Sequence, residues 1–482
     1  MKTWIAYFSA ALFALAGCAA VGPDYVQKDA RAPEGYSALE TGISTSNPVQ
    51  AELLRSWWTT FQDPVLDGLM REALAGNLDL RIARARVQQA RALSRVSSSG
   101  LLPEGGVSGR YDRLRRSESG AEAVGGSGGR TTDFYLAGFD AAWEIDIFGG
   151  VRREIEAADA DLTASHEALN DTLVTLQGEV ARNYLQLRGI QFRLDIARQE
   201  VRARHDNVAV TEARAKAGLV SELDAARARG ELATAQARIP FLERSLMAAT
   251  YRLGVLLGQE PESLQAEFRD PPQLPTVPAN LPAGLPSELL RRRPDIRRAE
   301  REVAAATARI GVSTAELFPK FSLTGSFGFS SNRFDELFRD RNNFWSIGPT
   351  ISWPILNVRR ILAGIEVSEA IQQEALARYE KTVLLSLEEV ENALVALSRE
   401  KQRMDALADS VRENDLAVQL AMDRYLAGLQ SFLAVTDAQA ALYAAEDQLA
   451  QSRENRALAF VALYKALGGG WLEQNVAENA SR

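Results

Sequence analysis

Apolar residues recur at alternating spacings of three and four along two very long stretches of the chain, about residues 151–213 and 364–424. This spacing places them on one face of a helix, and at 1.5 Å per residue the first stretch predicts a helix of roughly 95 Å, a pattern that the second stretch repeats. Alanine is frequent and bulky apolar residues are few, which lets neighbouring helices approach closely. Helices of this length must lie beside others of their kind. We expect Pro240, inside the following helix, to bend or interrupt that helix.

Four shorter segments alternate with a period of two, which predicts strands at about 104–117, 132–147, 319–331 and 343–356. The segment 319–331 alternates most regularly, with large apolar side chains on one face and small polar ones on the other. A strand between lipid and water shows this pattern, and so does a half-buried hairpin of a soluble protein. Four strands cannot close a pore, so a membrane-spanning sheet has to be shared between chains, as a dimer or a trimer.

The whole plan occurs twice along the chain. LAGNLDLRIARARV at 74–87 matches LRRRPDIRRAEREV with an offset of 216 (290 − 74), and LLP at 101 matches LFP with the same offset (317 − 101). AGLVS at 217 matches AGLQS with an offset of 210 (427 − 217). We therefore predict a first structural repeat at 57–260, a Pro-rich connector at 261–286 and a second repeat at 287–470. Neither repeat is expected to fold alone.

The N-terminus MKTWIAYFSAALFALAGCAA has a basic start, an apolar run from Trp4 to Leu15 and small residues before Cys18. The run is too short for a permanent membrane helix, so residues 1–17 are predicted to be a signal peptide. LAGC at 15–18 resembles a bacterial lipobox, which implies lipidation of Cys18 and a lipidated N-terminal segment at 18–56. The alternative is an ordinary signal peptide with an incidental cysteine. Residues 471–482 are predicted to be a C-terminal tail.

Composition narrows the classes of function. The net charge of the 482 residues is −8, and arginines alternate with acids instead of forming a basic patch, which argues against nucleic-acid binding. His166, His205 and Cys18 are the only histidines and cysteine, too few for a metal site or a Cys–His nucleophile, and no nucleotide-binding loop is present. We predict no catalytic residue, no metal and no cofactor. A cell-wall hydrolase with a carboxylate pair is an alternative, although the acids are spread along helices.

The duplicated plan, LLRRRPDIRRAE at 289–300 and LYKALGGGW at 463–471 closely resemble the TolC/OprM-type outer-membrane efflux channels. The lipobox places the resemblance with the lipoprotein, NodT-like branch of RND efflux systems. It covers the chain from WWTTFQDPVLDGL at 57–69 to Trp471. It implies an α+β membrane protein of TolC-like fold, in which a long α-helical periplasmic barrel continues into a β-barrel shared by three protomers.

The resemblance also implies function, location and partners. The function is that of the outer-membrane channel of a tripartite efflux system, a passive exit duct for drugs or other small molecules, without enzymatic activity. The location is the outer membrane, with a lipid anchor and an extension into the periplasm. The partners are two further copies in a homotrimer, a periplasmic adaptor (membrane fusion) protein, an inner-membrane RND-type pump and outer-membrane lipid. A type I protein secretion channel and a non-pore structural or adaptor lipoprotein stay open as alternatives.

A gate at the periplasmic end is part of the same resemblance. FLAVTDAQ at 432–439 matches the constriction of OprM-like channels, with Leu433 in place of its apolar ring and Asp437 in place of its acidic ring. The two residues are four apart and hence on one helix face. Ala440 stands where a family member carries arginine, which puts the pairing of the acidic ring in doubt. The alternative for Asp437 is a solvated acid near a helix start.

Three further residues, Asp224, Tyr425 and Gln430, match positions of a polar network that links neighbouring tip helices in this family. In the first repeat, the place of Asp437 is taken by Arg227 (437 − 210). The two repeats are therefore expected to share a scaffold and to differ at the tip.

Overall fold

The structure of the chain is a computed structural model, which describes residues 20–27, 54–115, 131–264 and 291–471 and isolated residues between these ranges. The predicted signal peptide, Cys18 and all but the first residue of the predicted tail lie outside the described residues. The chain forms two compact units, residues 1–28, 86–166 and 298–379, and residues 29–85, 167–297 and 380–482. Each unit contains pieces of both sequence repeats, so the compact units and the repeats do not coincide.

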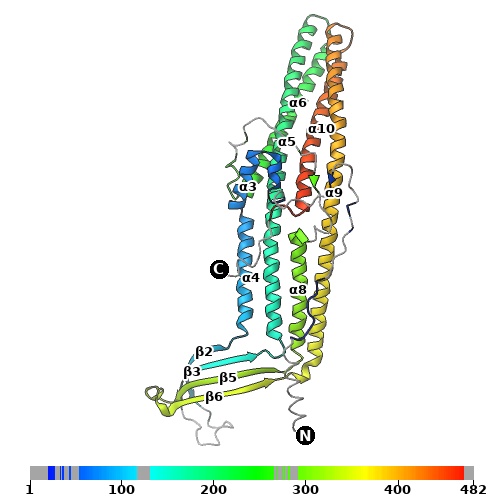
Figure 1. Cartoon of the computed structure of the whole chain (residues 1–482). Helices are drawn as coiled ribbons and strands as arrows, with labels where there is room; N and C mark the ends of the chain where they lie inside the picture. The colour runs from blue at the N-terminus through cyan, green and yellow to red at the C-terminus, as the bar shows by residue number, and fades with distance from the viewer. Residues whose placement is uncertain are drawn as a thin grey trace. The chain divides into compact units, whose positions relative to one another are not determined.

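The first unit holds a four-stranded antiparallel sheet in the order β2-β3-β5-β6, which Figure 1 shows side by side. The strands are β2 (Glu104–Arg115), β3 (Thr131–Ile145), β5 (Lys320–Ser331) and β6 (Asn343–Ser352). The four predicted strands are confirmed. The central pair joins the two repeats, because β3 of the first repeat pairs with β5 of the second. β2 and β6 form the edges, and two short turns of 3-10 helix, η3 (Phe334–Glu336) and η4 (Asp340–Asn342), precede β6.

Four helices contribute one end to the first unit and the other end to the second: α4 (Leu78–Ser99), α5 (Gly150–Lys216), α8 (Pro294–Ala315) and α9 (Val358–Leu426). The long helices predicted at 151–213 and 364–424 are confirmed as α5 and α9, with 67 and 69 residues. Short η5 (Ile355–Asn357) precedes α9. No helix in the described part of the chain is long and apolar enough to cross a membrane.

In the first unit, hydrogen bonds and an ion pair place these helices in the order α4, α5, α8, α9. Ser94 of α4 donates to Asp159 of α5 over 2.7 Å. Asp161 of α5 forms an ion pair with Arg309 of α8. Ser313 of α8 and Ser368 of α9 are joined by a hydrogen bond.

The second unit adds η1 (Trp57–Phe61), α3 (Pro64–Gly76), α6 (Glu222–Leu257) and α10 (Phe432–Ala466). Here the order is α6, α5, α10, α9, as three contacts show. Arg198 of α5 pairs with Glu243 of α6, Arg193 of α5 pairs with Asp447 of α10, and Ser452 of α10 donates to Glu400 of α9. The sequence analysis did not predict the parallel pair of two-residue strands β1 (Ile43–Ser44) and β4 (Leu281–Pro282).

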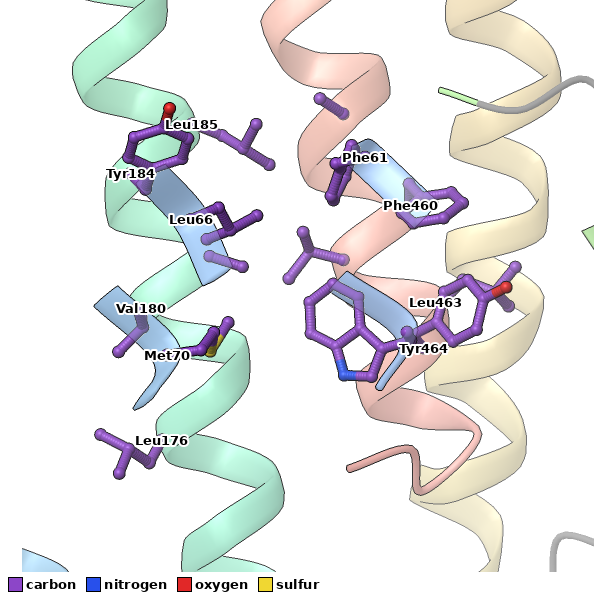
Figure 2. Close-up of a cluster of buried hydrophobic side chains, with 14 of the residues drawn as sticks. Phe61, Leu66, Met70, Leu176, Val180, Tyr184, Leu185, Phe460, Leu463 and Tyr464 are labelled. Carbon is purple, nitrogen blue, oxygen red and sulfur yellow. The ribbon is translucent and has the colours of Figure 1, made fainter. Parts of the chain in front are cut away.

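The main hydrophobic core lies in the second unit, where α10, α5 and the N-terminal elements η1 and α3 meet (Figure 2). Trp57 stacks on Tyr464 with ring centroids 5.6 Å apart, and Phe61 meets Phe460 edge-on at 4.9 Å. Such aromatic contacts add about 0.5–1.5 kcal/mol each to the free energy of apolar burial. Tyr184 of α5 is fully buried, and its hydroxyl donates to the Asp63 carboxylate, which also caps α3.

The two family-like motifs meet in the same unit. Arg293 of the RRRPDI motif donates to both carboxylate oxygens of Asp295, at 2.9 and 2.6 Å, and to Glu389 of α9 at 2.6 Å. Arg297 lies over the ring of Trp471, with the guanidinium carbon 5.2 Å from the ring centroid. The motifs therefore hold the start of α8 against the end of α10.

The duplication is visible in matched elements and contacts. α4 and α8 both have 22 residues, and β2 and β5 both have 12. The indole N–H of Trp143 donates to the Leu101 carbonyl oxygen over 2.9 Å. In the second repeat the indole N–H of Trp353 donates to Leu317 over 3.0 Å. The break between helix and strand is thus built in the same way in both repeats.

Pro240 does not interrupt its helix, because α6 runs unbroken from Glu222 to Leu257. The expected interruption was wrong, whereas a bend at Pro240, the other expected outcome, stays a prediction. A proline leaves the carbonyl four residues earlier without its helical partner, and Gln236 at that place is exposed, so water can bond this carbonyl.

Candidate functional site at the helix tips

Two tight turns end the long helices in the second unit, one between α5 and α6 and one between α9 and α10. Each has a glycine in the left-handed region, Gly218 with φ 72° and Gly428 with φ 74°. In each, the amide of the following leucine bonds five residues back and the glycine amide three residues back, which is a Schellman motif. The AGL repeat seen in the sequence therefore encodes two copies of one helix ending.

The helix starts that follow these turns differ. Ser221 and Asp224 form a capping box at the start of α6, in which each side chain accepts from the backbone N–H of the other residue. Ser431, at the same place before α10, makes no such bond, and Ala434 takes the place of Asp224. Within one chain, Asp224 therefore has a local capping role, which the Ser-x-x-Asp spacing could have indicated.

Leu433 and Asp437, the proposed gate residues, lie on one exposed face of α10, as their spacing predicts. The Leu433 side chain is 47% exposed, although its neighbours Phe432 and Val435 are buried. Ala440 lies on the same exposed face. In the described part of the chain, no side chain bonds the Asp437 carboxylate. This face of α10 is therefore free to meet solvent or another copy.

Tyr425, predicted to belong to a polar network, is only 2% exposed. Its ring lies 5.4 Å from that of Phe432, and its hydroxyl has no hydrogen-bond partner among the described atoms. Gln430 is exposed in the turn. Within one chain no bond joins Tyr425 or Gln430 to Asp224 among the described residues. The network between neighbouring copies stays a prediction.

Two inward contacts at the tip escaped the sequence analysis. Asn207 of α5 donates to Gln439 of α10 over 2.6 Å, and both side chains are buried. Arg214, in the last turn of α5, donates to the Leu426 carbonyl oxygen over 3.3 Å. Its guanidinium carbon lies 4.7 Å from the centroid of the Tyr425 ring. In the sequence, only polar residues such as Asn207 among the apolar positions of α5 could have indicated such contacts.

The sheet of the first unit has two chemically distinct faces. Val107, Phe139, Phe327 and Trp345 lie in one row across the four strands, and all four are exposed. On the opposite face the neighbouring row holds small and polar residues, namely Gly106, Asp140, Ser326 and Ser346. An exposed apolar face of this extent is typical of a surface that contacts lipid or another protein.

Comparison with known proteins covers nearly the whole chain. The family described as "Outer membrane efflux protein" matches residues 69–259 and 285–469. The pyoverdine export outer membrane protein OpmQ of Pseudomonas putida is 35% identical over 438 residues, which are 89% of this chain and 90% of that protein. Nodulation protein T of Rhizobium leguminosarum bv. trifolii is 29% identical over 463 residues, 95% of both chains. The structure of the outer-membrane channel OprN has 37% identity and a TM-score of 0.86, covering 94% of this chain and 99% of that chain.

These comparisons confirm the expected TolC-like fold class and the resemblance to OprM- and NodT-type proteins. The two separate family matches fit the predicted internal repeat. The tip turns and the two-faced sheet are accordingly the parts of an efflux channel, a transport duct without enzymatic activity. The chain belongs to the outer membrane efflux protein family and is the outer-membrane component of an efflux pump.

Proposed function

We propose that three copies of the chain form an exit duct through the outer membrane, with their four-stranded sheets joined into one closed sheet of twelve strands. The observation that supports this proposal best is the sheet with one apolar and one polar face, in which the edge strands β2 and β6 have no further strand beside them among the described residues. Unpaired backbone N–H and C=O groups cost several kcal/mol each in lipid, so such edges need partners. Pairing β6 of one copy with β2 of the next satisfies both edges and leaves the row of Phe327 and Trp345 toward lipid.

Disulfide trapping tests this assembly. The proposed lipidation would block Cys18, the only native cysteine, so introduced cysteines would report alone. Ser108→Cys on β2 is combined in turn with Phe344→Cys, Ser346→Cys or Gly348→Cys on β6, because the register between copies is not known. One combination should give a ladder that ends at three chains. A ladder that ends at two chains would replace the trimer by a dimer.

We propose that the two tip turns receive the periplasmic adaptor of an RND-type pump. Leu219 and Leu429 occupy equivalent places in the two turns and are 67% and 73% exposed. Neither leucine side chain is buried against its own chain, so both are suited to an apolar contact with a partner. Changing both to aspartate should abolish efflux in cells while leaving single-channel conductance in planar bilayers unchanged. Loss of conductance as well would show that the tips serve the duct itself.

We propose that the gate of this duct is formed by Leu433 and Asp437. A three-fold axis would bring together three exposed leucines and three carboxylates from the same face of α10. The three carboxylates repel one another at short distance. Position 440 holds alanine, so no arginine there can pair with them. The closed state would then depend mainly on the leucine ring and on contacts that hold α10 in place.

The cargo is proposed to be small molecules, and the outer-membrane end to be anchored by lipid at Cys18. The name of the relative OpmQ, which refers to pyoverdine export, favours a small-molecule cargo over a secreted protein. A strain without the gene should become sensitive to dyes, detergents and antibiotics, and plasmid-borne wild-type protein should restore resistance. Unchanged susceptibility with a missing secreted protein would indicate type I secretion. Absence of conductance from the purified protein would indicate a non-pore lipoprotein.

A further inference from the structure

Arg214 is a cation placed between two helix ends of the same chain. It lies in the last turn of α5, and its guanidinium donates to the Leu426 carbonyl oxygen at the end of α9. The last carbonyls of a helix lack helical partners and carry partial negative charge, which a nearby cation stabilises. One arginine therefore acts on the ends of both long helices.

The same guanidinium also lies over the ring of Tyr425, which is connected by packing to the proposed gate residues. This ring packs on Phe432, the first residue of α10. Phe432 directly precedes Leu433 in the chain. The small core around these rings consists of Ala228, Ala421, Tyr425, Phe432 and Val435, contributed by α6, α9 and α10. A displacement of Tyr425 would therefore be passed to the start of α10 through buried contacts.

The second repeat provides a natural comparison. The residue equivalent to Arg214 is Arg424 (214 + 210), which precedes the AGL sequence by the same number of residues. Arg424 is exposed, and no side-chain hydrogen bond or ion pair of it is found among the described residues. The two arginines thus share local sequence and helix position, but only Arg214 joins one tip turn to the other.

We propose that Arg214 is a positioning residue of the gate, which holds the α9–α10 turn against the end of α5 and so keeps Leu433 and Asp437 in their closed position. The effect on the gate rests on the proposed function, whereas the contact of Arg214 with Leu426 and Tyr425 does not. Without Arg214, the α9–α10 turn loses both its hydrogen bond and its cation–π contact with α5. The turn should then sample a wider range of positions, and the channel should leak.

The first test measures the contact directly. Nitroxide spin labels at Ala217 and Ala427, both exposed in the turns, report the distance between the two tips of one chain when labelled chains are diluted with unlabelled ones. The distance distribution should broaden in Arg214→Gln and stay as in the wild type in Arg424→Gln. Arg214→Lys keeps the charge but loses the planar donor group, and an intermediate width is expected. Equal distributions in Arg214→Gln and the wild type would overturn the proposal.

The second test measures the consequence. Arg214→Gln should raise single-channel conductance or open probability at least two-fold in planar bilayers, and Arg424→Gln should not. In a background of Leu433→Ser with Asp437→Ala, Arg214→Gln should add nothing, because both changes act on the same closed state. An additive increase would show that Arg214 acts elsewhere. A silent wild-type protein would reject the proposed function, while the spin-label distances would still decide the role of Arg214.

Misfolding is separated from gating by thermal unfolding in detergent. Arg214→Gln should unfold only slightly below Arg424→Gln, because the hydrogen bond and the cation–π contact that it loses lie at one end of the long helices. A wide label distribution together with an unfolding temperature close to that of the wild type supports the positioning role. A broad distribution that appears only with general destabilisation would make Arg214 a structural residue and overturn the proposal.

Discussion

The Arg293 guanidinium donates a hydrogen bond to the Ala466 carbonyl oxygen over 3.1 Å, which joins the residue before α8 to the last residue of α10. The same side chain, only 10% exposed, also holds Asp295 and Glu389. Burial lowers the pKa of Arg293, but the carboxylates of Asp295 and Glu389 outweigh it and raise this pKa above its ordinary value, so the guanidinium stays charged.

Arg293→Ala should therefore destabilise the protein by about 2–3 kcal/mol, because two carboxylates and one carbonyl lose a charged donor. Arg293→Lys should recover only part of this loss, because an ammonium group cannot donate to both oxygens of Asp295 and to Glu389 in the same geometry. Thermal unfolding of the purified protein measures the difference. Arg291→Ala, at an exposed position two residues earlier, is the control, and equal effects of both changes would contradict the prediction.

Glu454 of α10 should make the stability depend on pH. Burial raises the pKa of this carboxyl from about 4.5 to about 7, with Arg193 opposing the shift and Asp447 adding to it. The carboxyl packs against Gly189 of α5, and no ion pair or hydrogen bond reaches it among the described residues. Because the folded state holds a proton that the unfolded state releases, stability falls as pH rises from about 4.5 to about 7 and is level above that.

Glu454→Gln should remove this slope, since the amide is neutral at every pH. The variant should match the wild type near pH 4 and unfold at a higher temperature at pH 8. Glu388→Gln, which changes an exposed glutamate of α9, should keep the wild-type slope. A pH profile of Glu454→Gln that is parallel to that of the wild type would rule out this residue as the cause.

The gate makes a prediction with a matched control in the first repeat. Leu433→Ser with Asp437→Ala should raise single-channel conductance and sensitise cells to large antibiotics such as vancomycin, because the apolar and acidic rings are both removed. The equivalent residues of the first repeat are Leu223 and Arg227 (433 − 210 and 437 − 210), which are also exposed. Leu223→Ser with Arg227→Ala should leave conductance near the wild-type value. Equal effects in both repeats would place the constriction on both helix starts.

The two tryptophan hydrogen bonds at the helix-to-strand breaks should be equivalent in energy. Trp143→Phe and Trp353→Phe each remove a donor to a leucine carbonyl, and each should cost about 1 kcal/mol of stability. The bonds share no residue, so the costs should add in the double variant. Trp345→Phe, on the exposed apolar face of β6, is the control. A much larger cost at one break would show that the repeats have diverged there.

Lipidation is tested at the mature N-terminus. Mass spectrometry of the protein purified from membranes should find an acylated Cys18, because LAGC follows a short apolar run. Cys18→Ala should weaken sorting to the outer membrane more than it changes conductance, because one lipid anchor supports association but does not form the duct. An unmodified chain that begins at another residue would contradict the lipobox.

The sequence predicted the elements whose signals are local. The strand at 319–331, the long helices and both AGL turns follow from short-range periodicity or from a glycine that adopts positive φ, and the structure shows them close to the predicted bounds. The Ser221–Asp224 capping box was equally local, but the family resemblance directed attention to a network instead. Of the two outcomes expected at Pro240, the interruption was not found, because a proline pattern does not reveal whether the freed carbonyl is exposed.

The contacts that distinguish the two repeats could not be predicted from one sequence. Arg214 and Arg424 stand at the same place before an AGL turn, and no local rule tells which of them is directed toward the other tip. The direction of Arg214 depends on the packing of α5 between α6 and α10, which brings together residues far apart in the chain. The direction of Arg293 toward Ala466 likewise depends on residues far apart in the chain.

α4 and α8 have equal lengths, and so have β2 and β5, so corresponding residues of the two repeats lie at the same distance from the helix-to-strand break. Each residue added to a helix advances it by about 1.5 Å and turns the following side chains by about 100°. A single deletion inside α4 would therefore rotate Val87 relative to Ala83, both of which are buried, and would leave α8 unchanged. The two repeats would then differ in phase by more than a quarter turn. Insertions and deletions in this stretch of the gene should consequently survive evolution only as matched changes in both halves.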